Sequence, residues 1–586
     1  MIIYYILVNL LYLCSFLLIG EKLSKIFGIE KNLEVLSIKH LQYPIISIAF
    51  LSYTTSILIQ YGTNIKYLAI SINILLLGSG IYYIFINKNI LNILKKKNSI
   101  KKNIIFLIIL IFYLLLTLSP ITDADSLAYH AYFPKKILGL NNFFFDYYNF
   151  HESLIGVLEL FYVVPLIIKS DYTLQFINFL SFLSIAGIFY QIYKKKEFYV
   201  KILCLIIFLS PIFLQLIYSA KPQLLFISLS LLNFCLILSQ RKIENFRFII
   251  FSIFLIIFNF LGKPSFLISS FILSLLLLIK IYKDLKILNI IKLIFFALII
   301  YLPVVYARYL TFDHFNINNL INYLPAHLPG YKEFWIHLTN AQTEKLFPLS
   351  IFIPTSLNNI SSSLGLWPIF LIFIFKKEKN LFFPFMVIFL MILFGLKSNR
   401  FYIEPLLWVS YILLLKININ KKFGEYLKNL SFIQIIPMIG ILIYLSLYFF
   451  SSNFNETLKR NRLINHAYGY SFNEIINDKV KSSEFIVYNL RTLYYGNNNL
   501  IYPEFEKFTK EKIYYNQISK KKPKYLVLID SNIKNTFFKN CNFELIFNTK
   551  VKGKVNRKGN FFNFSSKNDL SSINIYRLLK NNTEGC

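Results

Sequence analysis

Long apolar runs separated by short polar segments make up the chain from Met1 to about Phe450. Crossing the hydrocarbon core of a membrane takes about 20 helical residues, and most of these runs approach that length. The pattern predicts an all-α polytopic membrane protein with about 13–14 transmembrane helices. The predicted spans are residues 1–20, 43–61, 66–87, 103–119, 172–193, 198–218, 223–240, 247–262, 265–281, 289–308, 358–376, 381–397, 401–416 and 432–450.

After Phe450 the apolar runs give way to short strand-like segments, which predict a small C-terminal extracytoplasmic α/β domain over residues 451–586. The remaining chain divides into N-terminal transmembrane helices (1–102) and a larger transmembrane domain (103–450) with an outer loop at 120–170. The expected strands are Glu484–Leu490, Lys524–Asp530, Phe543–Phe547 and Ile573–Leu578.

Composition supports the membrane assignment, since 56% of the residues are hydrophobic and 18% are aromatic. The formal charge of +33 invites a nucleic-acid interpretation, but the Lys and Arg residues lie in short clusters between apolar runs. That distribution is typical of cytoplasmic membrane loops. We therefore expect an integral membrane protein that contacts membrane lipid and no nucleic acid. The clusters lie at Lys95–Lys97, Lys101–Lys102, Lys194–Lys196, Arg241–Lys242, Lys280 and Lys283, Lys376–Lys377, and Lys421–Lys422.

Placing every basic cluster in the cytoplasm requires an even number of crossings between neighbouring clusters. The predicted spans meet this condition only if the apolar run Ser153–Ile168 does not cross. Because it is short and contains Glu159 and Pro165, we expect a juxtamembrane or half-inserted helix on the outer face. The outer side then holds the tail from Ser451 and the loops that contain Asp123, Lys221, Lys263, Arg308–Leu349 and Arg400.

The stretch from Ile121 to Lys135 directly follows a predicted span and holds two carboxylates, Asp123 and Asp125, with an aromatic residue and a histidine close behind. Carboxylates at a membrane boundary mark function when they face a cavity. A structural role competes with this, because Asp is a good N-cap for a helix starting near Ser126. Asp125 and Asp123 are the candidate catalytic residues.

The sequence Asp125-Ser-Leu-Ala-Tyr129 resembles the opening of the first large outer loop in polytopic transferases of the GT-C class. The similar branch contains the protein O-mannosyltransferases and the lipid A aminoarabinose transferase (glycosyltransferase family 39-like), in which one Asp is the catalytic base. Ser126 stands where relatives often carry Glu, which leaves room for Asp123 to share the task. The resemblance implies a membrane glycosyltransferase that moves a hexose or pentose from a polyprenyl-phosphate donor, with inversion, to an extracytoplasmic lipid, glycan or protein.

Three further short matches follow in order: Ser219–Gln223, Leu261–Ser265 and Ser398–Pro405. They imply a donor-phosphate site made by Lys221, Lys263 and Arg400. Charge grows on a phosphate as it leaves, so cations at this position would stabilise the transition state more than the ground state. The alternative is that these cations only extend from helix ends toward the membrane surface.

The remaining predicted substrate-binding residues are Tyr129, His130, His151, Glu152 and Tyr402. A purely structural histidine is an equally good interpretation of His130. No cofactor and no metal are expected, with a divalent ion at Asp123 and Asp125 as the alternative that oligosaccharyltransferases of the wider class illustrate. The loop Thr311–Ser350, rich in aromatic residues and histidine, suits either a cover over bound substrate or a surface that packs against the tail.

Two other functions remain open from the sequence. A transporter or flippase of lipid-linked sugars would use the same cations without a base, and a surface-polysaccharide ligase or polymerase would place its informative loop late in the chain. The expected location is a bacterial inner or plasma membrane with the site outside. The sugar, the acceptor and the oligomeric state do not follow from the sequence.

Overall fold

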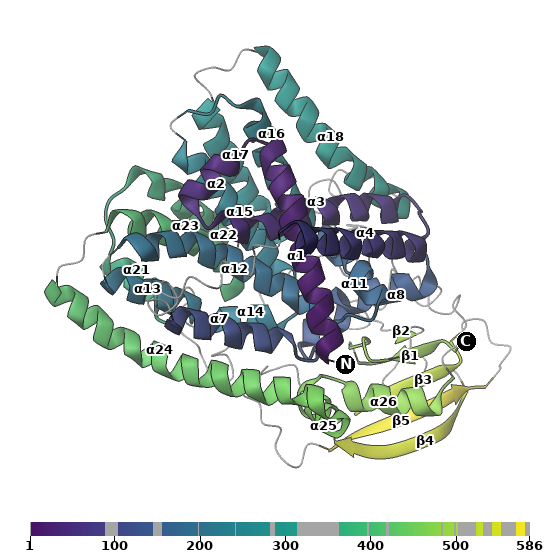
Figure 1. Cartoon of the computed structure of the whole chain (residues 1–586). Coiled ribbons are helices and arrows are strands. Elements are labelled where there is room, and N and C mark those ends of the chain that lie inside the picture. The colour runs from purple at the N-terminus through teal and green to yellow at the C-terminus, as the bar shows by residue number, and fades with distance from the viewer. Residues whose placement is uncertain are drawn as a thin grey trace.

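The computed structural model describes most of the chain as helices, with a small mixed sheet near the C-terminus (Figure 1). Helices occupy the part of the chain before residue 480, and all strands follow it. This agrees with the order predicted from hydropathy. The described residues are 2–87, 104–143, 155–196, 198–240, 242–281, 287–312, 363–394, 398–417, 421–481, 484–490, 492–496, 500–501, 523–530, 542–552 and 570–579.

Most predicted spans coincide with a helix or a helix pair. These helices are apolar on every face, as expected for helices that lie in a protein core or a membrane. Several helices begin at an Asn whose side chain accepts backbone N–H groups, as Asn64 and Asn245 do. The helices before residue 210 are α1 (Ile2–Ile26), α2 (Glu30–Leu36), α3 (Lys39–Gln60), α4 (Ile65–Ile86), α7 (Ile104–Thr117), α8 (Tyr132–Leu140), α10 (Val157–Phe161), α11 (Val163–Ile167), α12 (Tyr172–Lys195) and α13 (Phe198–Phe208).

The second half of the bundle continues with helices of similar character. A 3₁₀ turn at Pro264–Phe266 precedes α17, and another at Lys379–Leu381 precedes α22. The helices are α14 (Pro211–Tyr218), α15 (Gln223–Ser239), α16 (Phe246–Gly262), α17 (Leu267–Ile281), α18 (Ile287–Phe312), α21 (Trp367–Phe373), α22 (Phe382–Leu393), α23 (Asn399–Lys416) and α24 (Lys421–Phe450).

Five helices within the described ranges are long and apolar enough to cross a membrane, and a sixth span results if the bent pair α13–α14 counts as one. The five correspond to α1, α3, α4, α12 and α24. Other predicted spans, among them α7, α15, α16 and α17, form apolar helices of 10–17 residues. Length and composition therefore suggest a multi-pass membrane protein, with fewer full-length spans than the sequence predicts.

The loops with basic clusters and the loops with the predicted site residues lie at opposite ends of the bundle. At one end Lys196 Nζ donates to the Ile417 carbonyl (3.3 Å) and Lys280 Nζ to the Gln240 carbonyl (2.7 Å). At the other end Gln223 Nε2 donates to the Arg400 carbonyl (2.9 Å). The described basic loops and the predicted site loops thus lie apart, as the crossing parity requires. Which end faces the cytoplasm stays a prediction.

The described part of the run Ser153–Ile168, predicted to be a juxtamembrane or half-inserted helix on the outer face, is not one continuous helix, and its place relative to the membrane stays a prediction. That part forms two five-residue helices, α10 and α11, which pack against α3 and α4. Glu159 and the neighbouring side chains are buried inside the molecule. The reason is that Glu159 has protein partners there, so its carboxylate does not need the aqueous face.

The C-terminal part contains two helices and a five-stranded sheet of order β2-β1-β3-β5-β4 (Figure 1). β1 pairs in parallel with β2 and β3, whereas β5 is antiparallel to β3 and β4. The described strands match all four predicted segments. The elements are α25 (Glu456–His466), α26 (Tyr470–Lys479), β1 (Ile486–Tyr488), β2 (Leu500–Ile501), β3 (Tyr525–Ile529), β4 (Phe543–Lys552) and β5 (Leu570–Leu578).

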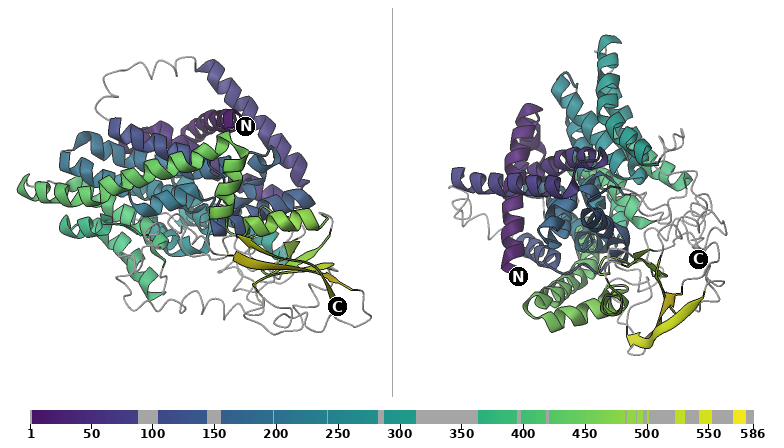
Figure 2. Two further views of the ribbon diagram at one scale, coloured as in Figure 1. Left: turned by 90° about the horizontal axis from the view of Figure 1, so that it is seen from below. Right: turned by 90° about the vertical axis from the view of Figure 1, so that its right-hand side faces the viewer.

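The termini of the bundle and the sheet meet in space. α24 runs along α7 and leads into α25 (Figures 1 and 2). The C-terminal part reaches α8, where Tyr132 Oη donates to the Leu500 carbonyl of β2 (3.4 Å). Residues separated by more than 350 positions therefore become neighbours at this end of the molecule, as the hydrogen bond from Tyr495 Oη to the Ile121 carbonyl (2.8 Å) illustrates.

Candidate functional site

The loop after α7 turns into a helix through an Asp cap. The Asp123 Oδ2 atom accepts hydrogen bonds from the Ser126 backbone N–H (2.9 Å) and the Ser126 hydroxyl (2.8 Å). A five-residue π-helix, Ser126–His130, follows directly. The structural interpretation of Asp123 as an N-cap is thus confirmed, and it leaves the other Asp123 oxygen available for a cation. π-Helical turns are frequent at functional sites because they redirect side chains.

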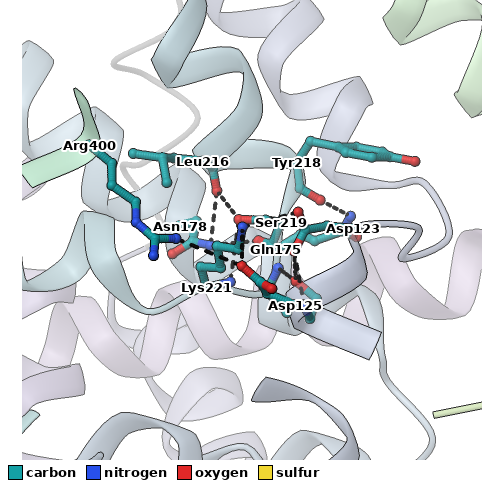
Figure 3. Close-up of polar contacts among 11 residues, drawn as sticks. Asp123, Asp125, Gln175, Asn178, Leu216, Tyr218, Ser219, Lys221 and Arg400 are labelled. Atoms are coloured by element: carbon teal, nitrogen blue, oxygen red, sulfur yellow. Dashed lines mark hydrogen bonds and ion pairs between the residues drawn. The ribbon is translucent and has the colours of Figure 1, made fainter. Parts of the chain in front are cut away.

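Lys221 lies in a turn between α14 and α15 that polar side chains of α12 hold in place (Figure 3). The Asn178 side-chain amide donates to the carbonyls of Leu216 (3.2 Å) and Ser219 (2.6 Å), and Gln175 donates to the Tyr218 carbonyl (2.5 Å). These carbonyls end α14 and lack helical partners of their own. The α12 amides therefore fix the turn that carries Lys221.

Lys221 joins the two carboxylates. Its Nζ lies 3.2 Å from Asp123 Oδ1 and 3.1 Å from Asp125 Oδ2, and Arg400 Nη1 lies 3.8 Å from the same Asp125 oxygen (Figure 3). The Asp123 and Lys221 side chains are each 5% exposed, whereas Asp125 is 22% and Arg400 29% exposed. Asp125 and Arg400 are thus the members of this cluster that a ligand reaches most easily.

Lys263, at the end of α16, belongs to the same electrostatic neighbourhood. Its Nζ is buried and has no hydrogen-bond partner, although the residue as a whole is partly exposed. Burial, followed by repulsion from Arg400, lowers the pKa of Lys263 from its usual 10.5 to about 7. A buried ammonium with no partner among the described residues is a cation for which a ligand can compensate.

A buried His–Glu pair lies next to this cation. His130 Nδ1 is 2.9 Å from Glu159 Oε1, and the second Glu159 oxygen accepts the Gly156 backbone N–H (3.0 Å). His130 is buried and its Nε2 has no partner. Burial lowers the pKa of His130 well below its usual value, and the charge of Lys263 lowers it further. The imidazole is therefore neutral at physiological pH.

Two glycines allow α10 and α16 to approach this closely. A Cβ atom added to Gly156 would lie 1.9 Å from the Gly262 carbonyl oxygen, and one added to Gly262 would lie 2.0 Å from Phe226 Cε1. Gly156 immediately precedes the helix of Glu159, and Gly262 immediately precedes Lys263. The backbone contact thus brings the His–Glu pair and the buried lysine together.

The C-terminal part closes over the same loop. The backbone N–H groups of Leu493 and Tyr494 donate to the Leu127 carbonyl (3.2 and 3.1 Å), and Lys135 Nζ donates to the Tyr494 carbonyl (2.5 Å). Tyr494 also hydrogen-bonds the Asp171 side chain at the start of α12. Residues near 494 therefore help to fix the π-helix that follows Asp125.

The structure brings together Asp123, Asp125, Lys221, Lys263, Arg400 and His130 of the predicted site residues. Tyr129 packs beside the His130 ring with centroids 4.0 Å apart. Tyr402 lies in α23 two residues beyond Arg400 and is fully buried. His151, Glu152 and the loop from 313 to 350 lie outside the described residues.

Sequence reasoning missed Glu159 as a site residue, because its partner His130 lies 29 positions earlier. It also passed over Gln223, whose buried Oε1 has no partner. A carboxylate in an otherwise apolar short run was the available signal for Glu159. Among the described residues, no three His, Cys, Asp or Glu side chains are grouped so as to hold a metal ion.

The fold and the cluster define a helix-rich protein in which apolar helices of membrane-span character carry a charged site at one end. The chain belongs to the DUF1420 N-terminal domain family, which matches residues 28–453. The match ends just after α24, so the sheet lies beyond it. Comparison with curated proteins and with solved structures found no match.

Proposed function

We propose that this protein is a GT-C-like membrane glycosyltransferase that moves a sugar from a polyprenyl-phosphate donor to an acceptor. The observation that carries the proposal is the position of the Asp125 carboxylate between Lys221 and Arg400, with the unpartnered Lys263 ammonium nearby. A carboxylate that can take a proton and several cations that can take a phosphate are the two parts that such a transfer requires.

In the proposed reaction, Asp125 removes a proton from the acceptor hydroxyl or amine. The acceptor atom attacks the anomeric carbon from the face opposite the phosphate, the bond from that carbon to the phosphate oxygen breaks, and the bonding electrons leave with the phosphate. The configuration at the anomeric carbon is inverted. Polyprenyl phosphate and the glycosylated acceptor are the products, and Asp125 returns its proton to water.

The cations support this assignment because they differ in whether they have an anionic partner. Lys221 and Arg400 hold Asp125, while Lys263 has no anionic partner at hydrogen-bond distance among the described residues. A donor phosphate that binds Lys263 and Arg400 would draw Arg400 away from Asp125 and make that carboxylate more accessible to the acceptor. Arg can grip phosphate through two parallel hydrogen bonds, whereas Lys supplies a point charge.

The test compares Asp125→Asn with Asp123→Asn in protein reconstituted in lipid, measuring transfer rate and donor affinity. Asp125→Asn keeps the shape but cannot take a proton, so we expect turnover to fall by about 10²–10⁴-fold with donor affinity kept. Asp123→Asn should retain most turnover, because Asn also caps helices well and the cap is the bond that Asp123 makes to Ser126.

If Asp123→Asn is inactive and Asp125→Asn active, the two carboxylates exchange roles. Wild-type transfer in both variants would make the carboxylates structural and favour a transporter or flippase of lipid-linked sugars. Bacterial inner-membrane location, with the site and the sheet outside the cytoplasm, is part of this proposal.

A further inference from the structure

His130 is held so that one of its ring nitrogens is offered to the site. The Glu159 carboxylate can only accept a hydrogen bond, so the hydrogen of the neutral imidazole lies on Nδ1. The second Glu159 oxygen is fixed by the Gly156 N–H. The ring therefore presents Nε2 as a hydrogen-bond acceptor, and this nitrogen is buried without a partner.

Among the described residues, both acceptors and donors around the charged cluster are buried without partners. His130 Nε2 and Gln223 Oε1 are buried acceptors, and Lys263 Nζ is a buried donor. Gln223 is tied to the site because its amide donates to the Arg400 carbonyl, and His130 feels the charges of Lys263, Asp125, Lys221 and Arg400. A site for a bare anion would offer donors alone, so the acceptors indicate a ligand that also carries hydroxyl or amino hydrogens.

We propose that His130, oriented by Glu159, recognises the hydrogen-bond donor at the 2-position of the donor sugar. The inference rests on the proposed function and extends it to the sugar. His130 lies among the cations assigned to the phosphate, and the 2-substituent is the sugar group next to the phosphate-bearing carbon. The ligand class is thus a polyprenyl-phosphate sugar with a free 2-hydroxyl or a 2-amino group. Glu159 is a positioning residue in this scheme.

The variants separate recognition from packing. His130→Asn keeps a side-chain N–H for Glu159 in place of Nδ1 and removes Nε2. Glu159→Gln lets the amide donate to Nδ1, which moves the ring hydrogen to Nε2 and turns the acceptor into a donor. The matched control is His466→Asn, because His466 is another buried histidine but contacts Tyr448 near the end of α24 rather than the site.

The measurement is the affinity of purified, lipid-reconstituted protein for polyprenyl phosphate and for its mannose, glucose and arabinose conjugates, each beside its 2-deoxy counterpart. Wild type and His466→Asn should prefer one 2-hydroxy sugar over its 2-deoxy form by about tenfold. In His130→Asn and Glu159→Gln the preference should fall to within about twofold, with affinity for polyprenyl phosphate unchanged. The double variant should add no further loss.

A His130→Asn protein that keeps the wild-type preference would overturn the inference and leave the proposed function intact. So would a wild type that binds polyprenyl phosphate as tightly as every sugar conjugate. Equal loss of affinity for polyprenyl phosphate and for the conjugates would make His130 a structural residue. Wild-type protein that binds none of these ligands would overturn the proposed function, and the inference with it.

Discussion

A single buried lysine sets the electrostatic character of the site. The Lys263 ammonium has no hydrogen-bond partner, and its pKa is lowered to about 7. Between that value and the usual 10.5, the unfolded chain binds a proton at this side chain that the folded chain does not. Stability contributed by this residue therefore rises with pH across the window, and below it the folded protein bears the full penalty of a buried charge.

We expect Lys263→Met to be more stable than wild type at pH 7, with the difference shrinking as pH rises toward 10. Thermal unfolding of both proteins in lipid, measured across this range, checks the sign. Affinity for polyprenyl phosphate should behave in the opposite way in wild type, falling above about pH 7 as the ammonium loses its proton. Equal stability of the two proteins at every pH would contradict the assignment of a buried, unpaired charge.

A substitution of Arg400 tests the proposed geometry of phosphate binding. Arg400→Lys keeps a positive charge but loses the two-pronged guanidinium, so we expect affinity for the polyprenyl-phosphate donor to fall by about 5- to 100-fold, the scale of a charge-assisted hydrogen bond. The control is Arg247→Lys, since Arg247 is exposed at the start of α16, at the opposite end from Lys263. Unchanged donor affinity in Arg400→Lys would remove Arg400 from the phosphate site.

At the scale of elements, the close contact of α10 with α16 brings Glu159 and Lys263 into the same site. Gly262→Ala would force a methyl group into the Phe226 ring and separate α16 from its neighbours. We expect a loss of about 1–3 kcal/mol of stability, the usual effect of overpacking, together with weaker donor binding. Thermal unfolding and donor titration measure the two effects.

Gly78→Ala is the matched control for Gly262→Ala. Gly78 lies within α4, and no atom comes within 4 Å of the position that its Cβ would take. Alanine there should be neutral or stabilise the helix slightly. If Gly262→Ala is as well tolerated as Gly78→Ala, the packing of α16 against Phe226 of α15 is loose and does not determine the position of Lys263.

The helices and strands were largely predictable, whereas the joints between them were not. Hydropathy locates α12 or α24 because each is a continuous apolar run. It locates β3 as a short apolar run and β5 through its alternating residues. The π-helix at Ser126–His130 has no periodic signal in the sequence. It depends on the Asp123 cap and on the hydrogen bonds from the C-terminal part to the Leu127 carbonyl.

The same distinction applies to the candidate site. The sequence predicted Asp125, Lys221 and Arg400 as site residues because they are charged and lie beside apolar runs. Ionisable residues close to membrane-spanning segments are often functional. The pairing of His130 with Glu159 could not be predicted, since it joins two segments whose approach depends on Gly156 and Gly262. Nor does the sequence say that Lys263 lacks a partner, which is a property of the packed structure.

For the whole molecule, the separation of basic loops from site loops predicts a two-sided arrangement in the membrane. In a cysteine-free background, we expect single cysteines at Thr63 and Asp478 to react with an impermeant maleimide from outside intact cells. A cysteine at Glu244, which is exposed at the opposite end, should react only after permeabilisation. Labelling at Glu244 with protection at Thr63 would place the site in the cytoplasm.

The contact between the Leu127 carbonyl and the backbone of Leu493 and Tyr494 has a consequence for biosynthesis. The loop that carries Asp125 leaves the ribosome early, but the residues that hold its π-turn are translated after the whole helical bundle. The site therefore reaches its final form only when the last stretch of the chain has been made and has folded back. We therefore expect premature stop codons between the bundle and Leu493 to abolish the proposed activity while leaving an inserted protein.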